Sequence, residues 1–373
     1  MVTFLLCLAL LVAAYFTYGR YLERLAGADA RSETPCRRLY DGVDYVPLPR
    51  WRIFLIQLLN IAGTGPIFGA ILGACFGPVA FLWITFGGIF MGAMHDYLSG
   101  MMLVRNDGLS IPEVVGRYLG GGMRQFMRVF SVLLLVLVGA VFLLSPAQLL
   151  ANIVPAVSCP AWVWIILAYY FVATLLPIDK IIGKVYPVFG VALVAMALGL
   201  LGALLFGGYR IPEMTTFANF QLDASSVPIV PTLFITIACG AISGFHATQS
   251  PLMARCVGNE RECRSVFYGA MISESVIALI WAAVAMAFFG GAGGLSEALG
   301  EHGNSAAWAV ATISTGTLGV VGGLLALLGV VAAPIPSGDT PFRSARLLIP
   351  DLLHLLQPPN LQRFPICHPL FPV

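Results

Sequence analysis

Long apolar stretches recur along the whole chain, and most of them end at an arginine or at turn residues. Their length, about 20 residues, is what an α-helix needs to cross a hydrocarbon core about 30 Å thick. Of the 373 residues, 59% are hydrophobic and only 10% are charged, whereas soluble domains carry about 25% charged residues. The chain is therefore expected to be an all-α polytopic membrane protein and not an ordinary soluble domain. No nucleic-acid partner is expected.

The apolar stretches predict about nine transmembrane helices, at approximately residues 2–18, 53–76, 78–104, 129–150, 162–176, 185–206, 229–255, 266–289 and 306–336. With this assignment every lysine and arginine except Arg210 falls on one side of the membrane. The positive-inside rule makes that side the cytoplasm. The N-terminus is then expected outside and the C-terminus inside. Residues 110–118 predict a short interfacial helix.

Two features of the sequence argue against other classes of protein. The eight cysteines show no metal-ligand spacing, so neither a metal site nor a disulfide framework is expected. The first apolar stretch lacks a preceding basic region and a convincing cleavage site, which predicts a retained helix and not a signal peptide. No cofactor and no catalytic residue are expected. Ser243 and His246 share a helical face, but the motifs of intramembrane hydrolases are absent.

One predicted span, at residues 229–255, contains the polar sequence Ser-Gly-Phe-His-Ala-Thr-Gln-Ser-Pro, from Ser243 to Pro251. His246 precedes Arg255 by nine residues, which corresponds to roughly 14 Å along a helix. His246 is therefore expected near the bilayer midplane, where an ionisable residue marks a functional site by default. The alternative is a kinked helix with a packed histidine.

Three other spans place polar groups at a similar depth. Asp96 lies nine residues from Arg105, Glu274 ten from Arg264, and Thr64 twelve from Arg52. Two carboxylates and two imidazoles at one depth cannot all be charged in a low dielectric. We therefore expect a cavity with proton-coupling groups, namely His95, Asp96 and Glu274. The alternative for Asp96 or Glu274 is a structural cap or pair with a neighbouring helix.

A second interruption is expected in the span at residues 53–76. Gly63-Thr64-Gly65-Pro66 after Asn60 favours unwinding, which is tolerated at membrane depth only where protein or water satisfies the backbone. By contrast, Gly69, Gly73 and Gly77 have the spacing that lets helices approach closely. The two interrupted spans are five spans apart and so cross in opposite directions, which is typical of an inverted five-helix repeat with substrate between the breaks. The expected substrate-binding residues are Asn60, Gly63, Thr64, Gly65, Ser243, His246, Thr248 and Gln249.

Ser337-Gly338-Asp339-Thr340 is expected at the cytoplasmic end of the ninth span, where Asp339 precedes Arg343 by four residues. This segment is too shallow to touch a substrate at the midplane. Asp339 or Thr340 either caps a following helix or forms a cytoplasmic gate. In the gate, Asp339 would pair with an arginine such as Arg52 or Arg105.

Several stretches of this sequence resemble the carbon starvation protein A family of transporters. They are Asp41-Gly42-Val43-Asp44-Tyr45-Val46-Pro47, residues 60–67, His95-Asp96-Tyr97, Arg105-Asn106-Asp107-Gly108, residues 243–255 and residues 334–346. The family is similar to the amino acid–polyamine–organocation superfamily, whose fold is an inverted repeat. The resemblance implies a secondary active transporter of the bacterial inner (plasma) membrane that takes up peptides or pyruvate under carbon starvation. Proton symport is the expected coupling. Sodium-coupled uptake and a non-transporting nutrient receptor on the same fold are the alternatives.

The expected domain organisation follows from the resemblance and the spans. Residues 1–350 would form the transporter domain, with an extra N-terminal helix at 1–19, a first repeat at 53–206 and a partial second repeat at 229–350. Family members continue with further hydrophobic helices after the equivalent of Pro350, whereas residues 351–373 predict an irregular tail. The chain is thus expected to be a C-terminally short member with an incomplete second repeat. The expected partners are the small-molecule substrate, protons and membrane lipid, and the sequence predicts no oligomeric state.

Overall fold

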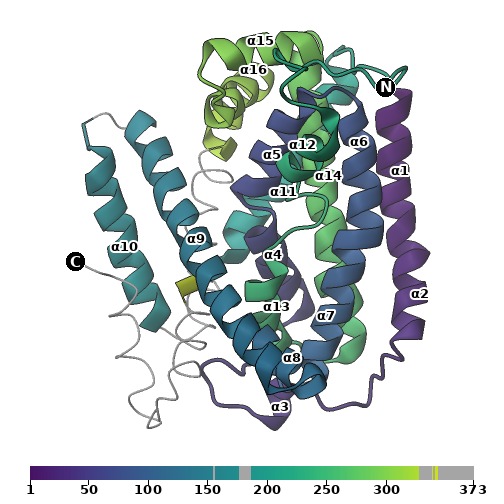
Figure 1. The fold of residues 1–373 in the computed structure, drawn as a ribbon, viewed down its shortest axis with the longest axis vertical. Helices are drawn as coiled ribbons and strands as arrows, with labels where there is room; N and C mark the ends of the chain where they lie inside the picture. The colour runs from purple at the N-terminus through teal and green to yellow at the C-terminus, as the bar shows by residue number, and fades with distance from the viewer. Residues whose placement is uncertain (154–155, 176–185, 327–337, 339–340, 343–373) are drawn as a thin grey trace.

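The computed structural model describes residues 1–153, 156–175, 186–326, 338 and 341–342. Every regular element in these ranges is a helix (Figure 1). In chain order the elements are α1 (Val2–Phe16), α2 (Tyr18–Leu25), α3 (Pro35–Arg38), α4 (Arg50–Ile61), α5 (Thr64–Ala74), α6 (Val79–Gly87), the π-helix η1 (Gly88–Gly92), α7 (Ala93–Arg105), α8 (Ile111–Leu119), α9 (Gly121–Ile153), α10 (Cys159–Leu175), α11 (Tyr186–Phe206), α12 (Ile229–Thr236), α13 (His246–Ala254), η2 (Glu260–Glu262), the π-helix η3 (Arg264–Gly269), α14 (Ala270–Phe288), α15 (Ala292–Glu301) and α16 (Ala306–Ala326). The all-α expectation is confirmed for the described residues.

Among the described residues, six helical stretches are long and apolar enough to cross a membrane: Val2–Leu25, Val79–Arg105, Gly121–Leu144, Pro187–Phe206, Glu260–Phe288 and Ala306–Leu325. A seventh arises if α4 and α5, which are bent by 48° at their junction, are counted together. The expected count of about nine is not reached by this criterion. One reason is that α10 has only 17 residues. The other is that the expected seventh span is divided into two short helices, α12 and α13.

Helix α14 is the centre of the bundle. It packs against α1, α4, α5, α6 and α11, and almost all of its residues are buried, including Trp281. A helix that is apolar on every side is stable only in lipid or in the interior of a large bundle. The fully buried Glu274 is therefore the exceptional residue of this helix.

The two broken segments, α4–α5 and α12–α13, lie against each other in opposite directions (Figure 1). Helix α5 packs against α12, and α4 packs against α13. The breaks are therefore at the same level of the bundle. This arrangement agrees with the antiparallel crossing expected from the sequence, although it does not by itself establish an inverted repeat of five helices.

Glycines allow α5 and α12 to approach closely. A Cβ atom at Gly65 would lie 2.9 Å from Cys239 Sγ, and one at Gly69 would lie 2.7 Å from the carbonyl oxygen of Thr236. Gly73 faces Ile237 in the same way, and Gly77 faces Phe220. The packing role predicted for Gly69 and Gly73 is thus confirmed, whereas Gly77 lies in the turn after α5 with a φ of +93° and faces Phe220 outside the helices. The break residue Gly65 shares this packing role.

The two ends of the bundle differ in charge. The end of the bundle where α3 and α8 are found (Figure 1) is here called the arginine-rich end. The elements that reach it carry Arg105 at the end of α7, Arg117 in α8, Arg124 near the start of α9, Arg255 directly after α13 and Arg264 at the start of η3. The first residues of α1 and helix α15 lie at the opposite end. There Glu213 accepts hydrogen bonds from the backbone N–H groups of Val2 and Thr3, at 2.6 and 2.9 Å. This carboxylate therefore satisfies free amides of the first turn of α1.

Of the two short helices α8 and α15, only α8 was predicted from the sequence. The interfacial helix expected at residues 110–118 is α8. Its Glu113 forms an ion pair with Arg128 of α9 at 2.5 Å, which holds the two helices together. Helix α15, in contrast, falls in the glycine-rich stretch between the spans predicted at residues 266–289 and 306–336, where no helix was predicted. Gly290 and Gly291 have positive φ values just before it, so these glycines make the turn that starts the helix.

Candidate functional site

The first break separates α4 from α5 at Ala62 and Gly63. Gly63 has φ −66° and ψ −145°, which is not helical, and α5 begins at the buried Thr64. Asn60, in the last turn of α4, donates a hydrogen bond from its side-chain amide to the carbonyl oxygen of Ile56 at 2.8 Å. The interruption predicted from Gly63-Thr64-Gly65-Pro66 is confirmed as a helix boundary.

The second break spans residues 237–245, and α13 begins at His246. Gly240 and Ser243 both have positive φ values, +92° and +56°. This conformation is uncommon for a residue other than glycine. The side-chain oxygen of Ser243 is buried and lies beside the carboxyl group of Glu274. The polar sequence at Ser243–Pro251 is thus a loop followed by a new helix.

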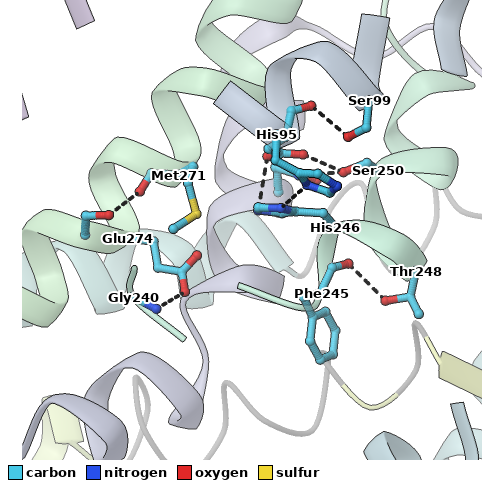
Figure 2. Close-up of polar contacts among 12 residues, drawn as sticks. His95, Ser99, Gly240, Phe245, His246, Thr248, Ser250, Met271 and Glu274 are labelled. Atoms are coloured by element: carbon cyan, nitrogen blue, oxygen red, sulfur yellow. Dashed lines mark hydrogen bonds and ion pairs between the residues drawn. The ribbon is translucent and has the colours of Figure 1, made fainter. Parts of the chain in front are cut away.

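Five buried or half-buried polar side chains meet where α4, α7 and α13 come together, and we call them the Asp96 cluster: Gln57, His95, Asp96, His246 and Ser250. His95 and His246 face each other with their Nδ1 atoms 3.3 Å apart and their rings nearly parallel (Figure 2). The Nε2 atom of His246 lies 3.6 Å from Asp96 Oδ2. Both His246 and Asp96 are buried, with 1% and 0% of the side chain exposed. The two histidines and the acid predicted at one depth are therefore in contact.

Asp96 is held by two further donors. Ser250 donates from Oγ to Asp96 Oδ1 at 2.7 Å, and Gln57 donates from Nε2 to Asp96 Oδ2 at 3.0 Å. Charge-assisted hydrogen bonds of this kind are stronger than those between neutral groups. The side-chain oxygen of Gln57, Oε1, is buried with no partner among the described residues. The cluster can therefore bind one more donor.

The chemistry of the Asp96 cluster suits the movement of one proton. A hydrogen bond between two Nδ1 atoms requires that one of them is unprotonated, so His95 and His246 cannot both be cations in this arrangement. The carboxylate of Asp96 lies on the other side of the His246 ring. A proton could therefore reside on either the carboxylate or an imidazole while the groups stay in place.

Glu274 lies in a different environment from the one expected. Its Oε1 atom accepts a hydrogen bond at 2.9 Å from the backbone N–H of Gly240 in the second break (Figure 2). Its Oε2 atom is buried without a hydrogen-bond partner in the described chain. No hydrogen bond or ion pair joins Glu274 to the Asp96 cluster within the described residues. The four titratable groups predicted around one cavity thus form a cluster of three and a separate carboxyl that holds the broken backbone.

The backbone segments of the two breaks are in contact on the side away from the arginine-rich end. A Cβ atom at Gly240 would lie 2.7 Å from the Cβ of Ala278 and 3.4 Å from the Cβ of Pro66. Gly65 meets Cys239 in the same region. The two breaks, between which substrate was expected, therefore pack directly against each other on the side opposite the arginine-rich end. Of the other expected contacts, Thr248 and Gln249 lie buried in the first turns of α13.

The expected gate or cap at Asp339, Thr340 and Arg343 lies outside the described residues. Its two candidate partners have other contacts. Arg105 forms an ion pair with the buried Glu260 at 2.9 Å and donates to the carbonyl oxygen of Gly27. The guanidinium of Arg52 lies 5.2 Å from the ring centre of Trp51.

Gln57 and Ser250 were missed by the sequence reasoning. The signal for both was their helical spacing. Ser250 follows His246 by four residues and Gln57 precedes Asn60 by three, so each lies on the same helical face as a residue that was selected. A polar residue on such a face of a span near the midplane is a candidate for the same site.

Comparison with known proteins identifies the family. The family described as carbon starvation protein CstA matches residues 1–159 and 148–328. This chain belongs to that family. It is 42% identical to an uncharacterized membrane protein of Haemophilus influenzae over 350 residues, covering 80% of this chain and 94% of the relative. With its apolar helices, it is an integral membrane protein.

More distant relatives in the family have named activities. The peptide transporter CstA of Escherichia coli is 25% identical over 72% of this chain and 47% of its own length. The pyruvate/proton symporter BtsT of the same organism is 26% identical over 72% of this chain and 46% of its own length. The chain thus spans about half the length of these two transporters.

Proposed function

We propose that this chain is a secondary active transporter of the inner membrane that takes up peptides or pyruvate during carbon starvation. The proposed coupling is symport with protons. Its relatives include a protein named as a peptide transporter and one named as a pyruvate/proton symporter. The observation that carries the proposal is the Asp96 cluster, a buried group of titratable side chains at the level where two antiparallel helices are broken.

The proposed substrate site lies between the two breaks. Backbone groups at Gly63–Gly65, with Asn60 and Thr64, would form one side. Ser243, His246, Thr248 and Gln249 would form the other. Both peptides and pyruvate carry a carboxylate, and the first turns of α5 and α13 present backbone N–H groups that suit a negative group. His246 belongs both to this site and to the Asp96 cluster, so substrate binding would be coupled to the protonation of Asp96 and His95.

Glu274 has a distinct role in this proposal. Its hydrogen bond from Gly240 fixes the backbone of the second break. Addition of a proton to Glu274 would weaken this contact, because a neutral carboxylic acid is a weaker acceptor than a carboxylate. The break would then be free to rearrange. Glu274 would therefore link proton uptake to the shape of the substrate site.

The test is uptake of labelled pyruvate and of a labelled dipeptide by proteoliposomes that contain the purified chain. An imposed inward proton gradient should accelerate uptake in the parent protein. Asp96→Asn and Glu274→Gln keep the size of each side chain but cannot carry the same proton, so uptake in both variants should no longer respond to the gradient. Glu297→Gln, at an exposed position of α15, is the matched control and should behave as the parent.

Two results would contradict the proposal in different ways. Uptake in both variants that still follows the proton gradient, and that stops when sodium is removed, would replace proton symport by sodium symport. Binding of substrate without any uptake would favour the non-transporting receptor.

A further inference from the structure

Arg255 is a buried cation without an acidic partner in the part of the chain that the structure describes. It follows α13 directly, and only 9% of it is exposed. Five other arginines at the arginine-rich end form ion pairs: Arg38, Arg105, Arg124, Arg128 and Arg264. Arg128 is buried to the same degree as Arg255, with 8% of it exposed, but Arg128 pairs with Glu113. Among the described residues, no carboxylate lies within ion-pair distance of Arg255. Buried charges are normally paired, so the structure leaves room for an anion.

The position of Arg255 is set by the loop that precedes α8. Its Nε atom donates to the carbonyl oxygen of Gly108 at 2.8 Å. Gly108 has a φ of +62°, and a Cβ atom there would lie 2.5 Å from Arg255 Cγ. On its other side the guanidinium carbon lies 5.0 Å from the ring centre of Tyr45. The nearby Asp107 is engaged by Arg38. The guanidinium is therefore held in place, and its charge is not neutralised by this neighbour.

A small pocket lined by Arg255 lies between α8, α9 and α13. Its polar wall consists of Arg255 and the hydroxyl-bearing residues Ser110, Ser131 and Thr248. The side-chain oxygen of Ser110 is buried and makes no hydrogen bond in the described part of the chain. The remaining wall is largely apolar, from residues such as Leu134 and Leu252. The Thr248 hydroxyl already donates to the carbonyl oxygen of Phe245 at 3.0 Å. Arg255 and the hydroxyl groups of Ser110 and Ser131, set against an apolar wall, form a site for a small anion.

The size of the pocket restricts the anion. Its volume is about 40 Å³, whereas one water needs about 10–15 Å³ on the same kind of measure. A carboxylate group fits, and a whole peptide does not. Arginine also favours carboxylates, because its planar fork can donate two parallel hydrogen bonds to the two oxygens.

We propose that this pocket binds a carboxylate, and that in transport it receives the carboxylate of the cargo as the cargo leaves the site between the breaks. Ala247 and Thr248, which line the pocket, follow His246 in the first turn of α13. The pocket is thus adjacent to the candidate site, on the side of the arginine-rich end. The role in cargo release rests on the proposed transport function, whereas carboxylate binding by the pocket does not.

The first experiment measures thermal unfolding of the purified full chain in detergent, with increasing sodium formate at constant ionic strength. Formate is the smallest carboxylate, and a ligand that binds only the folded state raises the unfolding midpoint in a saturable way. The parent should show this shift. The Arg255→Gln variant should need at least about tenfold more formate to reach the same rise in the unfolding midpoint, since a charge-assisted contact is lost. Arg261→Gln is the matched control, because Arg261 lies near the same end but is exposed; it should keep the parent response.

Two additions keep the test decisive. If Arg255→Gln does not fold, Ser131→Leu fills the pocket from α9 while leaving the arginine intact, and it should abolish the formate shift. In addition, the unfolding midpoint is measured with increasing sodium chloride in place of sodium formate. The proposal is overturned if formate does not raise the unfolding midpoint of the parent protein. It is also overturned if formate raises the midpoint of Arg255→Gln as much as that of the parent. An equal saturable response to chloride overturns the assignment to a carboxylate and leaves an inorganic anion site.

The role in release is measured separately in proteoliposomes, as exchange of labelled pyruvate across the membrane. In Arg255→Gln this exchange should be slower than in Arg261→Gln. A parent protein that binds formate but moves no pyruvate would count against the proposed function and leave the carboxylate site standing. Equal exchange in the two variants would remove Arg255 from the release path.

Discussion

At the scale of single residues, the distinctive feature is the set of contacts around Asp96. A carboxylate that is fully buried is costly unless its oxygens are satisfied. Here Ser250 and Gln57 each donate to it, and His246 lies 3.6 Å away. These contacts join α4, α7 and α13, so the same side chains that would carry the proton also connect the two broken segments. A change at any one of them should be felt in the other two helices.

Ser250→Ala tests this residue-scale connection. The substitution removes the 2.7 Å hydrogen bond to Asp96 Oδ1 and leaves a buried carboxylate with one donor fewer. We expect a loss of about 1–3 kcal/mol in the free energy of unfolding, measured as a lower thermal unfolding midpoint in detergent. Ser273→Ala is the control, since Ser273 donates only to the carbonyl oxygen of Gly269 one turn earlier in its own helix. Equal midpoints for the two variants would contradict the structural importance of Ser250.

At the scale of elements, the breaks and the glycines act together. The breaks at residues 62–63 and 237–245 divide two spans into halves. Gly65 and Gly69 then let α5 lie directly against α12 and its C-terminal continuation. A short helix such as α12 is not stable alone, so its position depends on this packing. We propose that the contact between α5 and α12 closes the candidate site toward the end opposite the arginines.

The substitution Gly69→Val should separate α5 from α12. The new side chain would collide with the carbonyl oxygen of Thr236, which would lie 2.7 Å from the added Cβ, so α5 and α12 must separate. Cys239, which faces Gly65 across the same contact, is the reporter. With the other seven of the eight cysteines replaced, a membrane-impermeant thiol reagent should label Cys239 faster in the Gly69→Val background. Gly202→Val is the control, because a Cβ at Gly202 meets no atom within 4 Å. The same labelling rate in both would show that this contact does not close the site.

At the scale of the whole molecule, the charge difference between the two ends decides the orientation that we propose. Arginines cluster at one end, and the region of Arg210 and Glu213 lies near the start of α1 at the other. The positive-inside rule places the arginine-rich end in the cytoplasm. In this orientation the pocket beside Arg255 faces the cytoplasm, and the closed contact between α5 and α12 faces outside.

The orientation is tested by two single cysteines in a chain without native cysteines. Thr216→Cys and Arg261→Cys both replace exposed residues, at opposite ends of the bundle. An impermeant maleimide added to intact cells, with the outer membrane permeabilised, should label the first and not the second. Both should be labelled after the inner membrane is lysed. The reverse pattern in intact cells would invert the topology and place the proposed release pocket on the outside.

Local properties of the sequence were sufficient for much of this description. The positions of the helices, the two interruptions and the clustering of arginine at one end follow from hydropathy, from glycine and proline, and from charge. Each of these depends on residues that are close together in the chain. The selection of His95, Asp96 and His246 came from depth alone, which helix geometry sets at about 1.5 Å per residue. Depth was therefore predictable, and these three residues do meet.

The direction in which each side chain points was decided only by tertiary structure. Glu274 was expected at a similar depth to Asp96, yet the rotation of α14 in the bundle brings it to Gly240. Gln57 and Ser250 became donors to Asp96 because α4 and α13 present those faces to α7. In the sequence, Arg255 differs in nothing from the other arginines, whereas in the structure it is buried beside a pocket with no acidic partner among the described residues. The rotation of a helix about its axis depends on contacts with helices far away in the chain, and a single sequence contains no direct measure of those contacts.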